Sequence, residues 1–187
     1  MAAQLSLILG GVRSGKSAFA EKLVRKLGQP TLYLATGVAT DGEMEERIRR
    51  HRGARPSSWL TVEEPLDLAG RLEVALAGPE APGTVLIDCL DVWLGNLLLE
   101  HQDQATEALR SLALSDVDRL LEVCRCSPAA FFLVSSEVGL SLVPPHPLGR
   151  CFQDILGLVN QKVADAATKV YLVVAGIPME IKGQSVS

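Results

Sequence analysis

The sequence predicts an α/β fold, with a mostly parallel central sheet, helices on both of its faces and an antiparallel edge strand near the C-terminus. Short runs rich in Leu, Ile and Val alternate with longer segments whose apolar residues recur at helical spacing. The short runs are apolar on both faces of a strand, as in parallel sheets buried between helices. Glycine and proline separate the segments.

The first half of the chain predicts four strands and three helices. The expected strands are 5–9, 31–35, 59–62 and 84–87, the last of them ending at Asp88. The expected helices are 14–27, 40–52 and 66–77. Gly28, with Pro30 beyond it, ends the first helix. Thr40 and Glu43 have capping-box spacing at the start of the second helix.

The second half continues the alternation. A long helical stretch over 92–126, broken near 102–104, precedes a strand, a helix, another strand and the edge strand, which are expected at 130–134, 148–167, 170–175 and 179–182. No repeat or long linker divides the chain, so residues 1–187 are expected to form one domain with a frayed tail from about residue 183.

The composition is that of an ordinary globular protein, with 48% hydrophobic and 21% charged residues. A formal net charge of -4 provides no overall basic field for nucleic acid, so no nucleic-acid partner is expected. The four cysteines form no C-x-x-C pair, which favours free thiols in a reducing cytosol over a zinc site. No signal peptide and no apolar run long enough to span a membrane is recognised, and a cytoplasmic location is expected.

Residues 10–17, GGVRSGKS, match the complete P-loop pattern and join an expected strand to an expected helix. The fold is therefore predicted to be P-loop NTPase-like. Glycines let backbone N–H groups surround a phosphate, and the helix N-terminus adds positive charge. The competing interpretation is a glycine-rich turn with a chance Lys-Ser. The predicted nucleotide contacts in this loop are Gly10, Gly11, Val12, Arg13, Ser14, Gly15, Lys16 and Ser17.

A P-loop also predicts how magnesium is held. Lys16 is expected to reach the β- and γ-phosphates, and the Ser17 hydroxyl is expected to bind Mg²⁺. An acidic residue at the end of a later strand usually supports the ion, and Asp88 has that position. Asp91 is a weaker candidate. Asp88 could instead be a helix N-cap, and the two roles are compatible.

The segment RIRRHRGARP, residues 47–56, is the second unusual feature. The arginines beside His51 favour a neutral imidazole by lowering its pKa, whereas the expected helix C-terminus favours the cation. A neutral imidazole is a nucleophile toward phosphorus, and arginines bind phosphates. The alternative is a solvated basic helix end.

Motifs along nearly the whole chain resemble one enzyme family. They are GGxRSGKS at 10–17, YLAT at 33–36, RIxxHxxxRP at 47–56, WxTxE at 59–63, LIDC at 86–89, NLL at 96–98, SEVG at 136–139, VNQ at 159–161 and LVVxG at 172–176. The chain is similar to the bifunctional adenosylcobinamide kinases / adenosylcobinamide-phosphate guanylyltransferases of cobalamin biosynthesis. The His-Arg-Pro and SEVG segments make this resemblance specific, since a P-loop alone defines only a superfamily.

The resemblance implies two reactions. A nucleoside triphosphate, ATP or GTP, phosphorylates adenosylcobinamide. GTP then transfers GMP to the phosphate through a GMP-histidine, which implies that His51 is the nucleophile, and releases pyrophosphate. The resemblance also implies a homotrimer. It further implies nucleotide contacts from Ala35, Thr36, Gly37, Arg52, Gly53, Ala54, Arg55, Glu63 and Asp88.

One loop departs from the family pattern. Pro144-Pro145-His146-Pro147 replaces a charged stretch, so contacts from this loop to substrate or to a neighbouring subunit are not carried over. Glu137 is a candidate for ordering the active site or for the kinase step, with pairing to an arginine as the alternative. Arg150 is a candidate phosphate contact, with a solvated helix face as the alternative. Two other functions stay open on the residues alone, a P-loop kinase without nucleotidyl transfer and a non-catalytic nucleotide switch.

Overall fold

The computed structural model describes residues 4–38, 53 and 55–183. These residues form a seven-stranded sheet in the order β3-β2-β4-β5-β1-β6-β7, in which β7 alone is antiparallel to its neighbour. The strands are β1 (Leu5–Gly10), β2 (Thr31–Ala35), β3 (Leu60–Glu63), β4 (Thr84–Asp88), β5 (Ala130–Ser136), β6 (Lys169–Val174) and β7 (Ile177–Lys182). The predicted mostly parallel α/β fold is confirmed.

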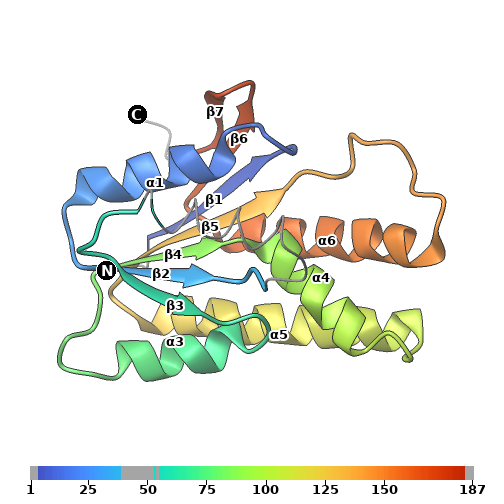
Figure 1. Cartoon of the computed structure of the whole chain (residues 1–187), viewed down its shortest axis with the longest axis horizontal. Helices are drawn as coiled ribbons and strands as arrows, with labels where there is room; N and C mark the ends of the chain where they lie inside the picture. Colours follow the sequence, from blue (N-terminus) through green and yellow to red (C-terminus); the bar gives the residue numbers. More distant parts are fainter. Residues whose placement is uncertain (1–3, 39–52, 54, 184–187) are drawn as a thin grey trace.

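Helices cover both faces of the sheet (Figure 1). They are α1 (Lys16–Leu27), α3 (Leu68–Leu76), α4 (Leu90–Glu100), α5 (Thr106–Cys126) and α6 (Pro147–Ala166). Alternate residues of a strand face opposite sides, so β1 directs Leu7 and Leu9 into the core beneath α3 to α6. Ile8 points the other way and packs with Ala20 and Val24 of α1.

Most predicted elements are confirmed with small shifts at their ends. The first helix begins at Lys16 rather than at residue 14, because Gly15 has the left-handed φ of 92°. Gly28, also left-handed, ends that helix as expected. The stretch over 92–126 is broken as predicted, although α4 already begins at Leu90. The helix expected over 40–52 lies outside the described residues.

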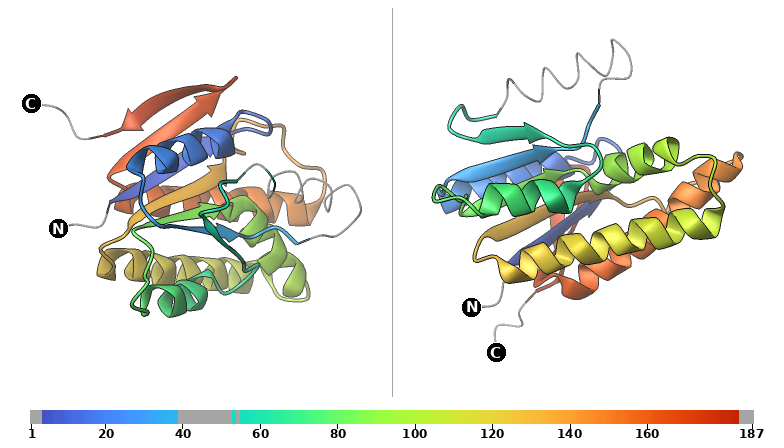
Figure 2. Two further views of the ribbon diagram at one scale, coloured as in Figure 1. Left: turned by 60° about the vertical axis from the view of Figure 1, so that its left-hand side comes forward. Right: turned by 90° about the horizontal axis from the view of Figure 1, so that it is seen from below.

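β7 is the predicted antiparallel edge strand and lies at the outer end of the sheet (Figure 2, left). It begins at Ile177, two residues before the expected start, because a tight turn at Ala175 and Gly176 joins it directly to β6. The expected frayed tail falls mostly on residues 184–187, outside the described part. Among the helices that the structure describes, none has the length and apolar character needed to cross a bilayer.

The topology collects the functional segments at one edge. Parallel strands all end on the same side of a sheet, where α/β proteins usually bind ligands. β1 ends in the predicted P-loop, β4 ends at Asp88, and β2 ends at Ala35 directly beside Asp88. Gly10 pairs with Ser136 at the end of β5.

Candidate nucleotide-binding site

The loop between β1 and α1 has the tight backbone of a phosphate-binding turn. Arg13 and Gly15 have positive φ angles of 57° and 92°, and the Ser14 N–H donates to the Gly11 carbonyl at 3.2 Å. Gly10 is enclosed, since a Cβ there would lie 2.4 Å from Ser14 Oγ and 2.7 Å from the Val173 carbonyl oxygen. Successive N–H groups in such a turn, followed by a helix N-terminus, form an anion site.

The turn between β6 and β7 contacts this loop directly. The Gly176 N–H donates to the Ser14 carbonyl at 2.8 Å. Gly176 Cα would lie only 3.3 Å from a Cβ on Gly15. The conformation of the loop therefore depends on the turn between β6 and β7 as well as on its own glycines.

Lys16, Ser17 and Asp88 have the arrangement that a P-loop requires. The Lys16 ammonium donates to the Gly11 carbonyl at 3.4 Å, across the mouth of the loop. Ser17 Oγ donates to Asp88 Oδ1 at 3.0 Å, although the two residues are far apart in the sequence. The N-cap of α4 is Cys89, not Asp88, so the Asp88 carboxylate is directed at the P-loop. A hydroxyl and a carboxylate are oxygen ligands of the type that Mg²⁺ prefers, so these residues fit the ion.

Tyr33 holds the second oxygen of Asp88, a contact that the sequence analysis missed. Its hydroxyl donates to Asp88 Oδ2 at 2.5 Å. The side chain is 1% exposed, and burial, followed by the charge of Asp88, raises the pKa of Tyr33 well above its usual value. A tyrosine in an apolar strand was the available signal, because a buried phenol almost always has a hydrogen-bond partner.

Thr36 joins the ends of β2 and β4. Its buried hydroxyl donates to the Cys89 carbonyl and accepts from the Cys89 N–H, each at 2.8 Å. Asn96 of α4 donates to the Thr36 carbonyl at 2.8 Å. Ala35 and Glu63 pair in register beside it, and Gly37 follows. Thr36 thus positions the residue after Asp88, while nucleotide contacts from 35–37 and Glu63 stay predictions.

A second polar group lies between α4, β5 and α6. Ser136 Oγ donates to Asp91 Oδ2 at 2.6 Å, and Asn160 Nδ2 donates to the Ser136 carbonyl at 3.0 Å. Burial, followed by the charge of Asp91, raises the pKa of the neighbouring Cys89 well above its usual value. These contacts join the SEVG and VNQ motifs to the first turn of α4. Asp91 is therefore engaged with β5 rather than with Ser17.

The arginine-rich segment is described only in part. His51, Arg52 and Ala54 lie outside the described residues, so their predicted roles stay predictions. Gly53 is exposed. The Arg55 guanidinium carbon lies 3.5 Å from the centre of the Tyr33 ring, a cation–π contact. Arg55, at the described end of this segment, therefore contacts Tyr33, the same side chain that donates to Asp88.

The proline loop before α6 is fastened by Arg150. The Arg150 guanidinium donates to the carbonyls of Pro144 and Pro145 at 3.1 and 2.7 Å. Glu137 accepts from the Gly139 N–H at 2.6 Å and has a local turn-forming role. Trp93 is buried and donates to the Leu66 carbonyl at 2.9 Å, which makes it a core residue.

The loop between a buried parallel strand and a helix, with a lysine, a serine and an opposed carboxylate, defines a P-loop nucleotide-binding protein. The chain belongs more particularly to the family described as cobinamide kinase / cobinamide phosphate guanyltransferase (CobU), whose model matches residues 6–181. The family resemblance predicted from the motifs is confirmed, and with it the assignment as a bifunctional transferase of cobalamin biosynthesis.

Three relatives agree with this assignment over nearly their full lengths. The bifunctional adenosylcobalamin biosynthesis protein CobP of Pseudomonas aeruginosa is 43% identical over 178 residues, covering 95% of this chain and 97% of the relative. The proteins CobU of Escherichia coli and Salmonella typhimurium, with the same bifunctional description, are 38% and 39% identical over 182 residues. In both cases the match covers 94% of this chain and 98% of the relative.

Proposed function

We propose that this protein phosphorylates adenosylcobinamide with ATP or GTP and then transfers GMP from GTP to adenosylcobinamide phosphate through a GMP-histidine at His51. The observation that carries the proposal is the P-loop in contact with Asp88, with Ser17 and the carboxylate 3.0 Å apart. Family membership supports the corrinoid substrate.

The two reactions break different bonds of the nucleotide. In the kinase step the substrate hydroxyl attacks the γ-phosphorus, the bond to the β-phosphate oxygen breaks, and the nucleoside diphosphate leaves. In the guanylyl step an imidazole nitrogen of His51 attacks the α-phosphorus of GTP, and pyrophosphate leaves. An oxygen of adenosylcobinamide phosphate then attacks the same phosphorus, and the N–P bond breaks. The loop of residues 10–17 would hold the pyrophosphate side in both cases.

Magnesium completes the proposed site. Ser17 and Asp88 would hold the ion, which when bound neutralises charge on the phosphate oxygens. Lys16 binds the β- and γ-phosphates, and the loop N–H groups orient them. Arg55, already beside Tyr33, and the other arginines of 47–55 would bring positive charge toward the α-phosphate.

The proposal is tested by covalent labelling. The protein is incubated with Mg²⁺ and GTP labelled at the α-phosphate, denatured, and examined for retained label. A histidine phosphoramidate is labile in acid and stable in alkali, and His51→Ala is expected to abolish it. His101→Ala, which changes a histidine at the end of α4, is the matched control and should keep the label. Unlabelled wild-type protein, or full labelling of His51→Ala, would contradict the proposal.

Lys16→Ala gives an independent test of the phosphate loop. Because one loop serves both reactions, we expect the rates of kinase and guanylyl transfer to fall together, by about a hundredfold or more, as for removal of a preorganised electrostatic donor. Wild-type rates for either reaction in this variant would contradict the shared-loop proposal.

The assembly and the location are also proposals. Ile177, Met179 and Ile181 alternate along β7 and leave one apolar side of this strand exposed, which supports self-association. A homotrimer is expected, and light scattering coupled to size exclusion would measure its mass. The four free cysteines are typical of a reducing compartment, and we place the reactions in the cytoplasm.

A further inference from the structure

Each carboxylate oxygen of Asp88 accepts a hydrogen bond, and the two donors belong to different elements. Oδ1 accepts from Ser17 of α1 at 3.0 Å, and Oδ2 accepts from the hydroxyl of Tyr33 on β2 at 2.5 Å. We propose that Tyr33 is a positioning residue for the magnesium site, because its hydroxyl fixes the orientation in which Asp88 presents Oδ1 to Ser17. This inference rests on the proposed Mg²⁺ role of Ser17 and Asp88.

The strand register places the two side chains together. Ala35 pairs with Asp88, and Tyr33 lies two residues before Ala35 on the same face of the sheet. Tyr33 and Asp88 are thus diagonal neighbours, a separation that an aromatic side chain spans. Ser17 reaches the same carboxylate from α1, which covers this face. A short side chain at position 33 would leave Oδ2 without this donor.

Tyr33 is held by its own surroundings. Its ring is 1% exposed and packs in the core cluster on the α1 side. The Arg55 guanidinium carbon lies 3.5 Å from the ring centre, and Trp59 stacks on the ring with centroids 6.3 Å apart. A ring fixed on several sides holds its hydroxyl at one place, as precise orientation of a ligand residue requires.

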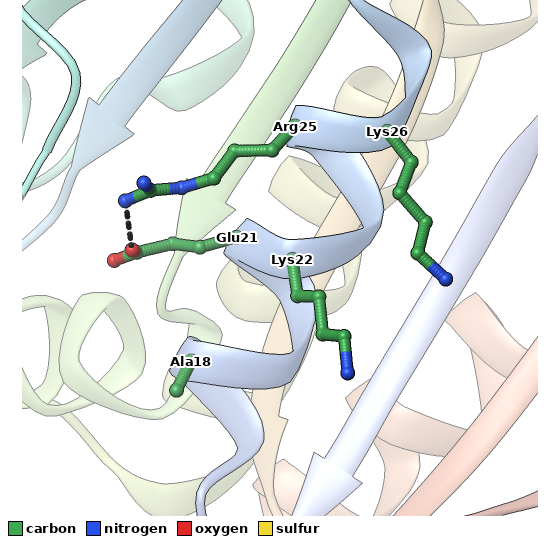
Figure 3. A pocket seen from close by; sticks show the side chains of 5 residues that line it. All are labelled: Ala18, Glu21, Lys22, Arg25 and Lys26. Atoms are coloured by element: carbon green, nitrogen blue, oxygen red, sulfur yellow. Dashed lines mark hydrogen bonds and ion pairs between the residues drawn. The ribbon is translucent and has the colours of Figure 1, made fainter.

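Trp59, which stacks on Tyr33, is itself contacted by a side chain from the surface of α1. The Arg25 guanidinium carbon lies 5.7 Å from the Trp59 ring centre. Glu21, one turn earlier, pairs with Arg25 at 3.3 Å, and both side chains extend to the same side of the helix (Figure 3). None of these contacts uses the Tyr33 hydroxyl. Tyr33→Phe therefore removes the bond to Asp88 while keeping the packing of the ring.

Loss of the Tyr33 hydroxyl should therefore reduce the gain in nucleotide affinity that Mg²⁺ provides. Without its donor on Oδ2, the Asp88 carboxylate is free to turn, and the advantage that Mg²⁺ gives to nucleotide binding falls. The phosphate loop itself does not involve Tyr33, so binding without Mg²⁺ is unchanged. Loss of a residue needed only for stability would change nucleotide binding equally with and without Mg²⁺.

The test is calorimetric titration with α,β-methylene-GTP, which blocks guanylyl transfer, in excess Mg²⁺ and in EDTA. The readout is the ratio of the Kd in EDTA to the Kd in Mg²⁺. We expect Tyr33→Phe to lower this ratio about three- to tenfold, as for loss of a hydrogen bond to a charged group, with the Kd in EDTA within about twofold of wild type. Tyr171→Phe, which removes a hydroxyl beside Glu180, is the matched control and should keep the wild-type ratio.

Asp88→Asn distinguishes the positioning role of Tyr33 from the proposed Mg²⁺ role of Asp88. If Asp88→Asn lowers the ratio and Tyr33→Phe does not, the positioning role of Tyr33 is wrong and the magnesium site stands. If neither variant changes the ratio, the Mg²⁺ role of Asp88 fails and the inference fails with it. Equal weakening of both Kd values in Tyr33→Phe would show a purely structural role and also overturn the inference.

Discussion

Gly10 is closely enclosed by its neighbours at the start of the phosphate loop, and Gly10→Ala tests this enclosure. An added Cβ would lie 2.4 Å from Ser14 Oγ and 2.7 Å from the carbonyl oxygen of Val173. The Ser14 side chain can rotate. The Val173 carbonyl is backbone, in a strand paired with β1 on one side and β7 on the other, so it cannot move alone.

The loss of stability expected for Gly10→Ala follows from this enclosure. Forcing one extra carbon into a closely packed site costs about 1–3 kcal/mol. For a protein of this size each kcal/mol lowers the Tm by about 2–4 °C, so we expect a decrease of about 4–8 °C for a cost of about 2 kcal/mol. Because Gly10 also begins the loop, the nucleotide Kd should rise.

Gly11→Ala is the matched control. Its added Cβ would meet no atom within 4 Å, and Gly11 is not among the glycines with positive φ. Alanine fits such a backbone and even restricts the unfolded chain, so the free energy of unfolding should be unchanged or higher by up to about 1 kcal/mol. Urea unfolding followed by circular dichroism measures both variants. If Gly10→Ala were as stable as Gly11→Ala, the steric reasoning would be refuted.

Two further predictions concern Thr36 at the site and the buried thiol of Cys124 in α5. Thr36→Val leaves the Cys89 N–H without its partner and the Cys89 carbonyl with the Trp93 N–H as its remaining donor. The free energy of unfolding should therefore fall by about 1–3 kcal/mol, whereas Thr36→Ser should keep most of the wild-type stability; equal urea midpoints for Thr36→Val and wild type would contradict this. Burial raises the pKa of the Cys124 thiol to about 12. The unfolded thiol ionises first, so stability should fall between about pH 9 and 12, by about 1.4 kcal/mol per unit from this group, and unfolding curves of Cys124→Ala should lack that contribution.

Local patterns predicted the scaffold and the phosphate loop. The P-loop is a contiguous motif whose chemistry depends on residues next to one another, and its flanking strand and helix are read from hydrophobic periodicity. Asp88 was likewise found from its place at the end of an apolar strand, and its contact with Ser17 follows from the parallel topology. The break between α4 and α5 was visible as a polar stretch.

The supporting contacts were not predictable in the same way. The bond from Tyr33 to Asp88 depends on the register between β2 and β4, which no local pattern specifies. Thr36 is predicted only as a nucleotide contact, and the bonds of its hydroxyl to Cys89 depend on how two strand ends meet. Such contacts join segments distant in sequence, so their partners become apparent only in the folded sheet.

The contact between Gly176 and Ser14 has a consequence for biosynthesis of the protein. The phosphate loop is synthesised well before Gly176, whose N–H secures the Ser14 carbonyl. β1 also lies between β5 and β6, both from the second half of the chain. A nascent chain should therefore gain nucleotide affinity only after β6 and β7 have been synthesised and their hairpin has closed.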